Sequence, residues 1–366
     1  MTDPKLIAFH LPQFHRIPEN DEWWGEGFTE WTNVKKARSI YPGHYQPRVP
    51  AGGRYYNLLD PDVQDWQANL AKTHGLHGFC YYHYWFNGKQ LLERPVEQLL
   101  ERGKPDFPFC LAWANEPWTR AWDGGERHVL MPQVYGGPED WRKHITYLIK
   151  IFRDPRYIRV HDKPMFLIYR TSGIRDMKQM LEVWNEELHR AGFKGIHLVS
   201  MATAHEPETR IHLFDAYADF EPMWTIFRKL PGRFRRKERW LTKLAKLQWK
   251  ILGRANRTKL SHDYNAIWTA LEQRILPPHH YPGAFVDWDN SPRRPGDQAL
   301  VMRNFDKRVF ARGIRTQVKK ARSVGAEFLF INAWNEWAEG TYLEPDEARG
   351  LFFLESIRDA LNSPLD

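Results

Sequence analysis

Short apolar runs recur along the chain, and each is followed by a polar or amphipathic segment. Eight of these runs have the length and continuous hydrophobic character of strands buried in a parallel sheet. We predict strands at residues 6–11, 78–84, 108–113, 165–169, 196–201, 215–219, 283–288 and 327–333. Apolar positions at helical spacing lie between them. We predict helices at residues 61–74, 90–102, 138–152, 176–191, 264–276, 301–324 and 350–361.

Eight strand-then-helix units predict an α/β fold. The expected architecture is a (β/α)8 TIM barrel with inserted βα loops. The connection after the fifth strand is short, and its helix is the least clearly marked. A doubly wound open sheet is the competing arrangement, and it usually has a Gly-rich first turn for a nucleotide. Leu11-Pro12-Gln13 is no such turn. We therefore predict a single barrel catalytic domain over residues 1–366.

The net charge of +8 is concentrated in one segment. Residues 228–259 carry 13 Lys or Arg and one acidic residue, and the rest of the chain is net −4. We interpret residues 225–262 as a basic helical insertion after strand 6. A helix is predicted at residues 239–252, because four apolar residues fall at helical spacing: Trp240, Leu244, Leu247 and Ile251.

This helix could lie on an anionic membrane surface, or it could pack over the barrel mouth as a solvated flap. Nucleic acid is the weaker candidate partner, since the charge is confined to one segment. No run of 18 apolar residues and no apolar N-terminal segment with a cleavage site occurs. We expect a cytoplasmic location, with the insertion allowing peripheral association at the inner face of the membrane.

The sequence lacks the motifs of several other kinds of functional site. Cys80 and Cys110 lie in apolar runs, which predicts buried thiols rather than a zinc or redox site. There is no Walker loop, no Gly-x-Ser-x-Gly and no His-x-x-x-His. We expect no cofactor and no metal, and the oligomeric state is left open.

Polar and aromatic residues follow the predicted strands, where a barrel places its active site. Their convergence from separate strands, with 17 Trp and 15 Tyr in the chain, suits a wall that holds a polar, ringed ligand such as an oligo- or polysaccharide. The candidate substrate-binding residues are His10, Trp31, Tyr82, His83, Trp85, Trp113, Asn115, Trp118, Asp123, Glu221, Asp287, Trp288, Asn335 and Trp337.

Some of these residues have equally ordinary structural explanations. The two histidines could be hydrogen-bonded core residues. Tyr81, Tyr82 and Tyr84 alternate along one strand, so at least one of them faces the helices. Asp287 could be a solvated loop residue.

Two glutamates after the last predicted strand are the strongest catalytic candidates. Glu336 and Glu339 are three residues apart, with Trp334 and Trp337 close to them in the sequence, and Gly340 follows. Desolvation among indoles can raise the pKa of one carboxyl while the other stays ionised, as an acid/base pair requires. Solvated loop charges or salt bridges are the ordinary alternative, which the strand-end position disfavours.

Five motifs carry a resemblance to a known family. They are AFHLPQFH at residues 8–15, WWGEGFTEW at 23–31, YYHYWF at 81–86, WANE at 113–116 and WNEWAEG at 334–340. Together they resemble the WbsX-type family, which is itself similar to glycoside hydrolase family 99. The similarity spans nearly the whole chain. It implies a (β/α)8 barrel acting on glycans, in a family often described as glycosyltransferases of surface polysaccharide synthesis.

The family 99 hydrolases are retaining endo-acting α-mannosidases with two glutamates in a similar segment. One is a base toward the substrate's own 2-hydroxyl, and the other is the acid/base on the leaving oxygen. The resemblance assigns these roles to Glu336 and Glu339, respectively. The chain departs from the pattern at Pro117, where many members have asparagine, and in the basic insertion, which we recognise in none of the hydrolases.

Two further questions stay open at this point. Asn115-Glu116-Pro117 also resembles the acid/base turn of other barrel glycosidases, in which case Glu116 is the acid and Glu336 the nucleophile. For the whole chain we expect a retaining glycoside hydrolase-like enzyme acting on a cell-surface or O-antigen-type polysaccharide. A glycosyltransferase of lipopolysaccharide or other surface polysaccharide synthesis, and a non-catalytic glycan-binding barrel, are the alternatives.

Overall fold

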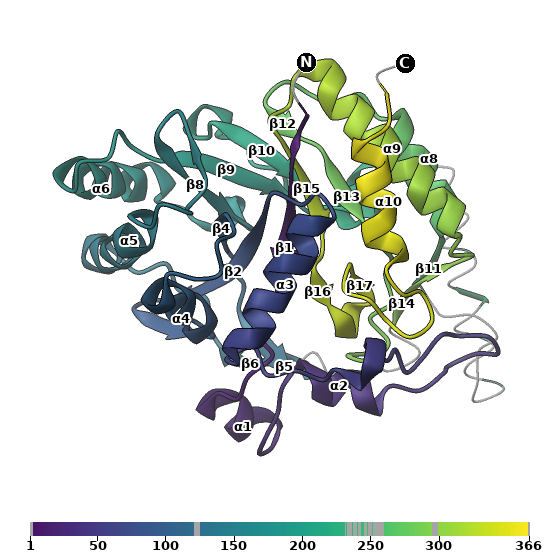
Figure 1. The fold of residues 1–366 in the computed structure, drawn as a ribbon. Helices are drawn as coiled ribbons and strands as arrows, with labels where there is room; N and C mark the ends of the chain where they lie inside the picture. The colour runs from purple at the N-terminus through teal and green to yellow at the C-terminus, as the bar shows by residue number, and fades with distance from the viewer. Residues whose placement is uncertain are drawn as a thin grey trace.

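The computed structural model describes residues 3–120, 125–230, 260–294 and 299–364, with scattered positions between 232 and 251. Parallel strands form a barrel wall that contains all eight predicted strands (Figure 1). Around the ring, the order is β10, β9, β8, β4, β2, β1, β15 and β13, with β12 beside β10. The strands are β1 Lys5–His10, β2 Gly78–Phe86, β4 Phe109–Trp113, β8 Lys163–Ile168, β9 His197–Ala202, β10 Ala216–Asp219, β12 His280–Tyr281, β13 Gly283–Phe285 and β15 Phe328–Asn332.

The seventh strand position closes the ring, and it is interrupted at Pro282. On one side of this proline β12 pairs with β10, and on the other side β13 pairs with β15. Proline lacks the N–H that a strand ladder needs, which explains the break. Gly283 lies so close to β10 that a Cβ there would be 2.0 Å from the carbonyl oxygen of Asp219. The predicted (β/α)8 barrel is confirmed.

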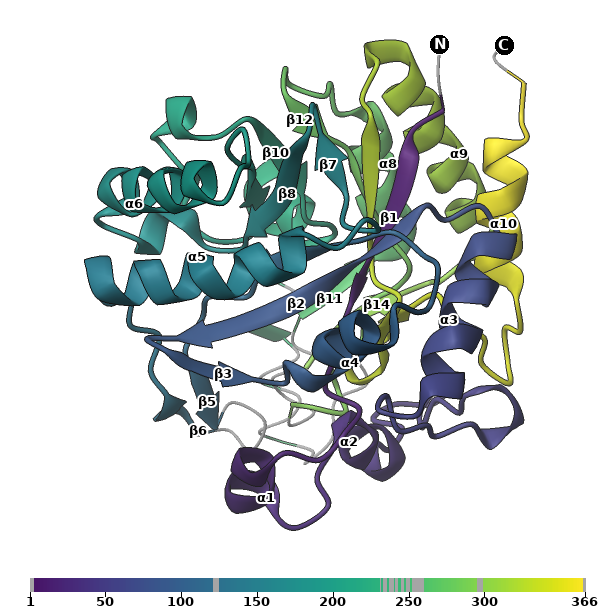
Figure 2. The ribbon, with the colours of Figure 1, turned by 60° about the vertical axis from the view of Figure 1, so that its left-hand side comes forward.

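Helices surround the ring (Figure 2). They are α3 Pro61–Thr73, α4 Arg94–Arg102, α5 Pro138–Phe152, α6 Met177–Arg190, α8 Tyr264–Gln273, α9 Lys307–Val324 and α10 Phe352–Leu361. Each lies within a predicted helix, and the largest differences are at α4 and α9, which begin only at Arg94 and Lys307. Residues 89–91 form β3, which pairs with β2, and residues 300–303 form β14, which pairs with β11 Leu260–Asp263. Among the described residues, no helix is both long and apolar enough to cross a bilayer.

The fifth unit has no α-helix in its described connection. Between β9 and β10 the chain forms only the 3₁₀ turn Ile211–Leu213. The strand predicted at 283–288 ends at Phe285. The helix predicted at 239–252 lies largely outside the described residues and stays a prediction.

The barrel interior is a packed core of aromatic rings. Phe9 stacks on Tyr82 at 5.9 Å and on Phe330 at 5.5 Å, and meets Phe220 edge-on at 5.2 Å. A core of this kind fills the barrel, so the barrel is not a pore. A cavity at one end of the barrel is therefore closed at its base.

Inserted elements gather at the carboxyl ends of the strands, opposite both chain termini (Figures 1 and 2). They are α1 Pro18–Trp24, α2 Glu30–Lys36, the hairpin of β5 Trp118–Arg120 with β6 Gly125–Met131, and the hairpin of β16 Asn335–Glu336 with β17 Thr341–Tyr342. At the other end, β7 Arg159–Val160 pairs with β8.

Candidate active site

A cavity of about 430 Å³ lies at the carboxyl ends of the barrel strands. Residues after the other strands of the ring, and residues near the end of β2 itself, contribute to its wall. Tyr82 and Phe220 connect this wall to the aromatic core below. Six predicted site residues line the cavity together: Tyr82, Glu116, Trp118, Trp288, Glu336 and Glu339.

The β16–β17 hairpin presents the two C-terminal glutamates to this cavity. Glu336 ends β16, and Glu339 ends the 3₁₀ turn Trp337–Glu339. Gly340 then adopts a positive φ of 68°, and a Cβ there would lie 2.9 Å from the backbone nitrogen of Asp289. Only glycine fits this position without strain, so the turn depends on it.

Asn335 holds the start of the β16–β17 hairpin against the loop that follows β1. Its Oδ1 accepts from the Leu11 backbone N–H at 2.7 Å, and its Nδ2 donates to the Leu11 carbonyl at 3.0 Å. Both hydrogen bonds are buried, where they hold the amide in one orientation. Asn335 therefore supports Glu336 from behind rather than facing the cavity.

A buried carboxylate holds the two tryptophans that flank the glutamates. Glu344 accepts from the indole N–H of Trp334 at 3.0 Å and from that of Trp337 at 2.6 Å. Gln67 and Tyr56 donate to the same carboxyl group at 2.7 and 3.0 Å. Burial raises the pKa of Glu344 to about 7, although these four donors act in the opposite direction.

One guanidinium joins the two glutamates to a third. Arg293 donates from Nη1 to Glu339 at 2.8 Å, and from Nη2 to Glu30 at 2.8 Å and to Glu336 at 3.3 Å. Glu30 begins α2 and also accepts from the Ala338 backbone N–H at 3.0 Å. Three carboxyl groups, one from α2 and two from the β16–β17 hairpin, therefore converge on Arg293.

The electrostatics of this cluster favour a bound proton. Burial raises the pKa of Glu336 well above its ordinary value and raises the pKa of Glu339, while Arg293 opposes both shifts. Burial outweighs the opposing charges of Arg293 and Arg294 at Glu339, so this carboxyl keeps its proton to a higher pH than a free glutamate. A carboxyl group that keeps its proton is what general acid catalysis needs.

Glu116 approaches the same cavity from the loop after β4. Its Oε1 lies 2.7 Å from Nε2 of His205 and 3.8 Å from Nη1 of Arg170. The side chain is 37% exposed, so it is far less enclosed than Glu336. Asn115, next to it, is buried and bonds both the N–H and the carbonyl of Arg170, which ties the ends of β4 and β8 together.

Four predicted residues point outward from β1, β2 and β4 and do not line this cavity. His10 bonds Gln67 of α3 at 3.2 Å, and His83 bonds His144 of α5 at 2.9 Å. Trp85 donates to Asp140 at 3.0 Å, and Trp113 donates to the Trp85 carbonyl at 3.2 Å. Burial lowers the pKa of both histidines to about 3, so they are neutral members of the layer beneath the helices.

The remaining predicted residues that the structure describes also lie away from this cavity. Trp31 donates to the Tyr56 carbonyl and packs on Trp337 at 5.4 Å, while Trp337 stacks on Tyr342 at 3.8 Å. Glu221 is ion-paired with Arg274 at 2.7 Å. Asp287 is paired with Arg48 and Arg349 at 2.9 and 3.0 Å. Asp123 lies outside the described residues.

Sequence reasoning missed the residue that organises the cluster. Arg293 follows the seventh strand in a loop rich in proline and arginine, and no spacing rule separates it from Arg294. Tyr84 and Tyr169 also line the cavity. Tyr84 could have been found by its alternation with Tyr82, since residues two apart on a strand share a face.

Solved structures that share this barrel fold include a glycoside hydrolase. A structure of the family 99 endo-α-mannosidase from Bacteroides thetaiotaomicron superposes with a TM-score of 0.54 at 14% identity, covering 99% of this chain and 98% of that one. A protein described as glycoside hydrolase-like superposes with a TM-score of 0.61 at 12% identity, covering 100% and 95%. At these identities the likeness concerns the fold.

Sequence comparison gives closer relatives. The chain is 38% identical over 364 residues to the uncharacterized protein WxcX of Xanthomonas campestris pv. campestris, strain ATCC 33913, and 38% identical over 365 residues to WxcX of strain B100. It spans about half the length of these curated relatives, which is 50% in each case. Residues 6–357 match the family described as Glycosyltransferase WbsX. The resemblance found in the sequence motifs is confirmed, and the chain belongs to the WbsX family.

Proposed function

We propose that this chain is a glycan-active enzyme whose chemistry resembles that of a retaining endo-α-mannosidase, acting on a cell-surface or O-antigen-type polysaccharide. The observation that carries the proposal is the pair Glu336 and Glu339, enclosed at the barrel's carboxyl end and joined by Arg293. Cleavage of an acetal needs a proton donor for the departing oxygen and a second group that assists at the anomeric carbon.

The proposed roles follow the resemblance. Glu339 protonates the leaving oxygen, and Glu336 removes the proton of the sugar's 2-hydroxyl as that oxygen attacks the anomeric carbon. The aromatic wall formed by Tyr82, Trp118 and Trp288 suits the faces of sugar rings. The larger upward pKa shift is on Glu336, the proposed base, so kinetics and not the resting charge must assign the two roles.

Leaving-group dependence separates the roles. Glu339→Gln should lose about 10²–10⁴-fold in turnover of ordinary glycosidic linkages. It should keep most activity on 2,4-dinitrophenyl α-mannosides, whose leaving group needs no acid. Glu336→Gln should lose both activities. If Glu116→Gln shows the leaving-group pattern while Glu339→Gln does not, Glu116 is the acid and our assignment is wrong.

Glycosyl transfer is the second candidate, because the family is described as a glycosyltransferase. Arg293 and Arg294 in the cavity wall could meet an anionic donor. Parallel assays should therefore follow sugar release from bacterial surface polysaccharides and consumption of nucleotide-sugars. Release without nucleotide-sugar consumption supports hydrolysis, and the reverse supports transfer. Glycan binding that persists in Glu336→Gln, with no turnover by the wild-type protein, would indicate a binding barrel.

We also propose an anionic membrane surface as a partner of the basic segment 228–259. Its net charge of +12 and the helical spacing of its apolar residues support this. Among the described positions, Trp240, Leu244, Leu247 and Ile251 are exposed. The protein should float with phosphatidylserine-containing liposomes at low salt and be released at high salt. Equal flotation with neutral liposomes would contradict the proposal.

A further inference from the structure

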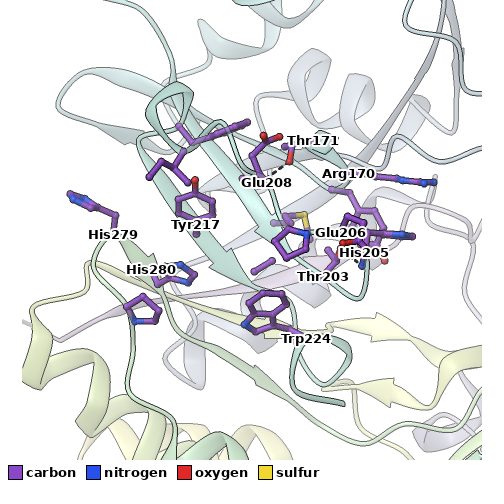
Figure 3. A pocket seen from close by; sticks show the side chains of 18 of the residues that line it. Arg170, Thr171, Thr203, His205, Glu206, Glu208, Tyr217, Trp224, His279 and His280 are labelled. Atoms are coloured by element: carbon purple, nitrogen blue, oxygen red, sulfur yellow. Dashed lines mark hydrogen bonds between the residues drawn. The ribbon is translucent and has the colours of Figure 1, made fainter. Parts of the chain in front are cut away.

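A second cavity, of about 790 Å³, lies where the barrel lacks a helix. The connection between β9 and β10 forms only a 3₁₀ turn, so no α-helix from this connection covers these strands. The cavity is bounded by residues of β9 and β10 and by the loops around them (Figure 3). Its size falls in the range of ligand pockets.

The wall of this cavity is largely apolar. Ile211, Phe214 and Trp224 contribute large hydrophobic surfaces, and Pro207, Pro277 and Pro278 add to them. Ile211 is 64% exposed, although it is a large aliphatic residue on the cavity wall. Exposed apolar surface of this kind in a concave site marks a place where something apolar binds.

Most polar side chains in the wall are already bonded within the protein. Glu208 accepts three hydrogen bonds from Arg210, at 2.7, 2.8 and 2.7 Å. Thr171 and Ser200 bond each other at 3.1 Å, and Asp215 accepts from the Leu198 N–H at 2.8 Å. A sugar ring needs many hydrogen-bonding partners. Among the described residues of this wall, the Tyr217 hydroxyl and the Arg170 Nε are the buried side-chain atoms without a partner. Its chemistry therefore fits a hydrocarbon group better than a further sugar.

This cavity adjoins the candidate active site. Tyr169 lines both, and its ring meets His205 edge-on at 5.7 Å. His205 lines the apolar cavity, and its partner Glu116 lines the catalytic one. In Figure 3, Arg170 and His205 lie together at one side of the apolar cavity, away from Tyr217 and His280. A molecule with a sugar in one cavity can thus place an attached group in the other.

We infer that the cavity beside β9 and β10 binds the hydrocarbon part of an amphiphilic glycan substrate, whose sugar occupies the cavity of Glu336 and Glu339. This inference rests on the proposed function for the sugar's location. The binding of the hydrocarbon itself does not depend on catalysis. The wild-type chain should therefore bind n-alkyl α-D-mannosides with an affinity that increases with chain length.

Calorimetric titration with the series from methyl to octyl α-D-mannoside, below micelle-forming concentrations, tests this. Each added methylene should lower Kd by about two- to fourfold. Glu336→Gln should show the same dependence, because it leaves the apolar wall intact. A protein without turnover but with this dependence would contradict the proposed function alone. A flat series in a catalytically active protein would overturn the inference alone.

Two variants locate the binding. Ile211→Asp places a charge on the cavity wall, and Ala202→Phe fills the cavity without adding charge. Both should abolish the chain-length dependence while keeping the wild-type melting temperature within a few degrees. Ile275→Asp is the matched control, because Ile275 is 89% exposed and lies outside this wall. Loss of the chain-length dependence in Ile275→Asp, or its survival in both cavity variants, would overturn the inference. Tighter binding of mannobiose and mannotriose than of octyl mannoside would also overturn it.

Discussion

Glu344 is a buried carboxyl group that the proposed chemistry does not use directly. Its two oxygens accept from two indoles, an amide and a phenol, and the indoles belong to the residues that flank Glu336 and Glu339. Replacing one oxygen by an NH₂ group places a donor against donors. Glu344→Gln should therefore lose about 1–3 kcal/mol in the free energy of unfolding, measured by denaturant titration. Glu355→Gln, at an exposed position on α10, should change little.

The pH dependence of this effect has a definite sign. Because the folded-state pKa of Glu344 is raised to about 7, the folded protein binds a proton that the unfolded chain has already released. The stability contributed by Glu344 is therefore full below about pH 4 and is lost as the pH rises to about 7. Relative to Glu344→Gln, the wild type should lose up to about 3 kcal/mol across this window. A constant difference between the two proteins would contradict the raised pKa.

Arg293 opposes the upward pKa shifts of both Glu336 and Glu339. Removing it in Arg293→Met should raise the pKa of both glutamates further, so the profile of kcat/KM against pH should move to higher pH. Stability should fall by about 3–5 kcal/mol, because buried carboxyl groups lose their cation. Arg293→Lys keeps the positive charge but loses the planar guanidinium that donates to several carboxyl groups. It should shift the pH profile less than Arg293→Met does.

Arg312→Met provides the control for this prediction. Arg312 pairs with Glu272 on the outer helices and is 50% exposed, so its loss should leave both the pH profile and the stability nearly unchanged. An unmoved profile in Arg293→Met would show that Arg293 does not set the ionisation of the pair.

At the scale of elements, the sequence predicts the positions of the strands well. It predicts less well which side chains of a strand face the barrel interior. Strands of a parallel barrel are apolar on both faces, so polarity does not alternate along them. Every residue of β2 is buried. His83 and Tyr82 are neighbours in the sequence, yet Tyr82 lines the cavity of Glu336 and Glu339 and His83 lies under α5. Strand alternation separates them into two faces, but only the packed structure shows which face is inside.

The packing of α8 against α9 depends on one glycine. A Cβ at residue 313 would lie 2.2 Å from Cε3 of Trp268. In an isolated helix, alanine would be about 1 kcal/mol better than glycine. Here the clash should reverse the sign, and Gly313→Ala should lose about 1–3 kcal/mol in thermal or denaturant unfolding. Arg315→Ala, at an exposed position on the same helix, should stay within about 0.5 kcal/mol of the wild type.

At the scale of the whole molecule, the repeating strand–helix pattern was sufficient to predict the barrel, because each unit is a local signal. The cluster of Glu30, Arg293, Glu336 and Glu339 was only half predictable. Its last two members share one motif, whereas Glu30 and Arg293 come from separate loops that meet only when the ring closes. The short connection between β9 and β10 was visible in the sequence, but the apolar cavity was not, because its wall is assembled from several separate loops.

Closure of the ring itself gives the last prediction. Strand β13 passes so near β10 that the obstacle to a Cβ at residue 283 is the backbone oxygen of Asp219, at 2.0 Å, and not a movable side chain. The two strands must separate to admit alanine, which strains the ladders on both sides of Pro282. Gly283→Ala should therefore lose at least about 2–3 kcal/mol in denaturant unfolding. Gly137→Ala is the control, because a Cβ there meets nothing within 4 Å, and it should lose less than about 1 kcal/mol. Equal losses in the two variants would mean that β10 and β13 can separate at little cost.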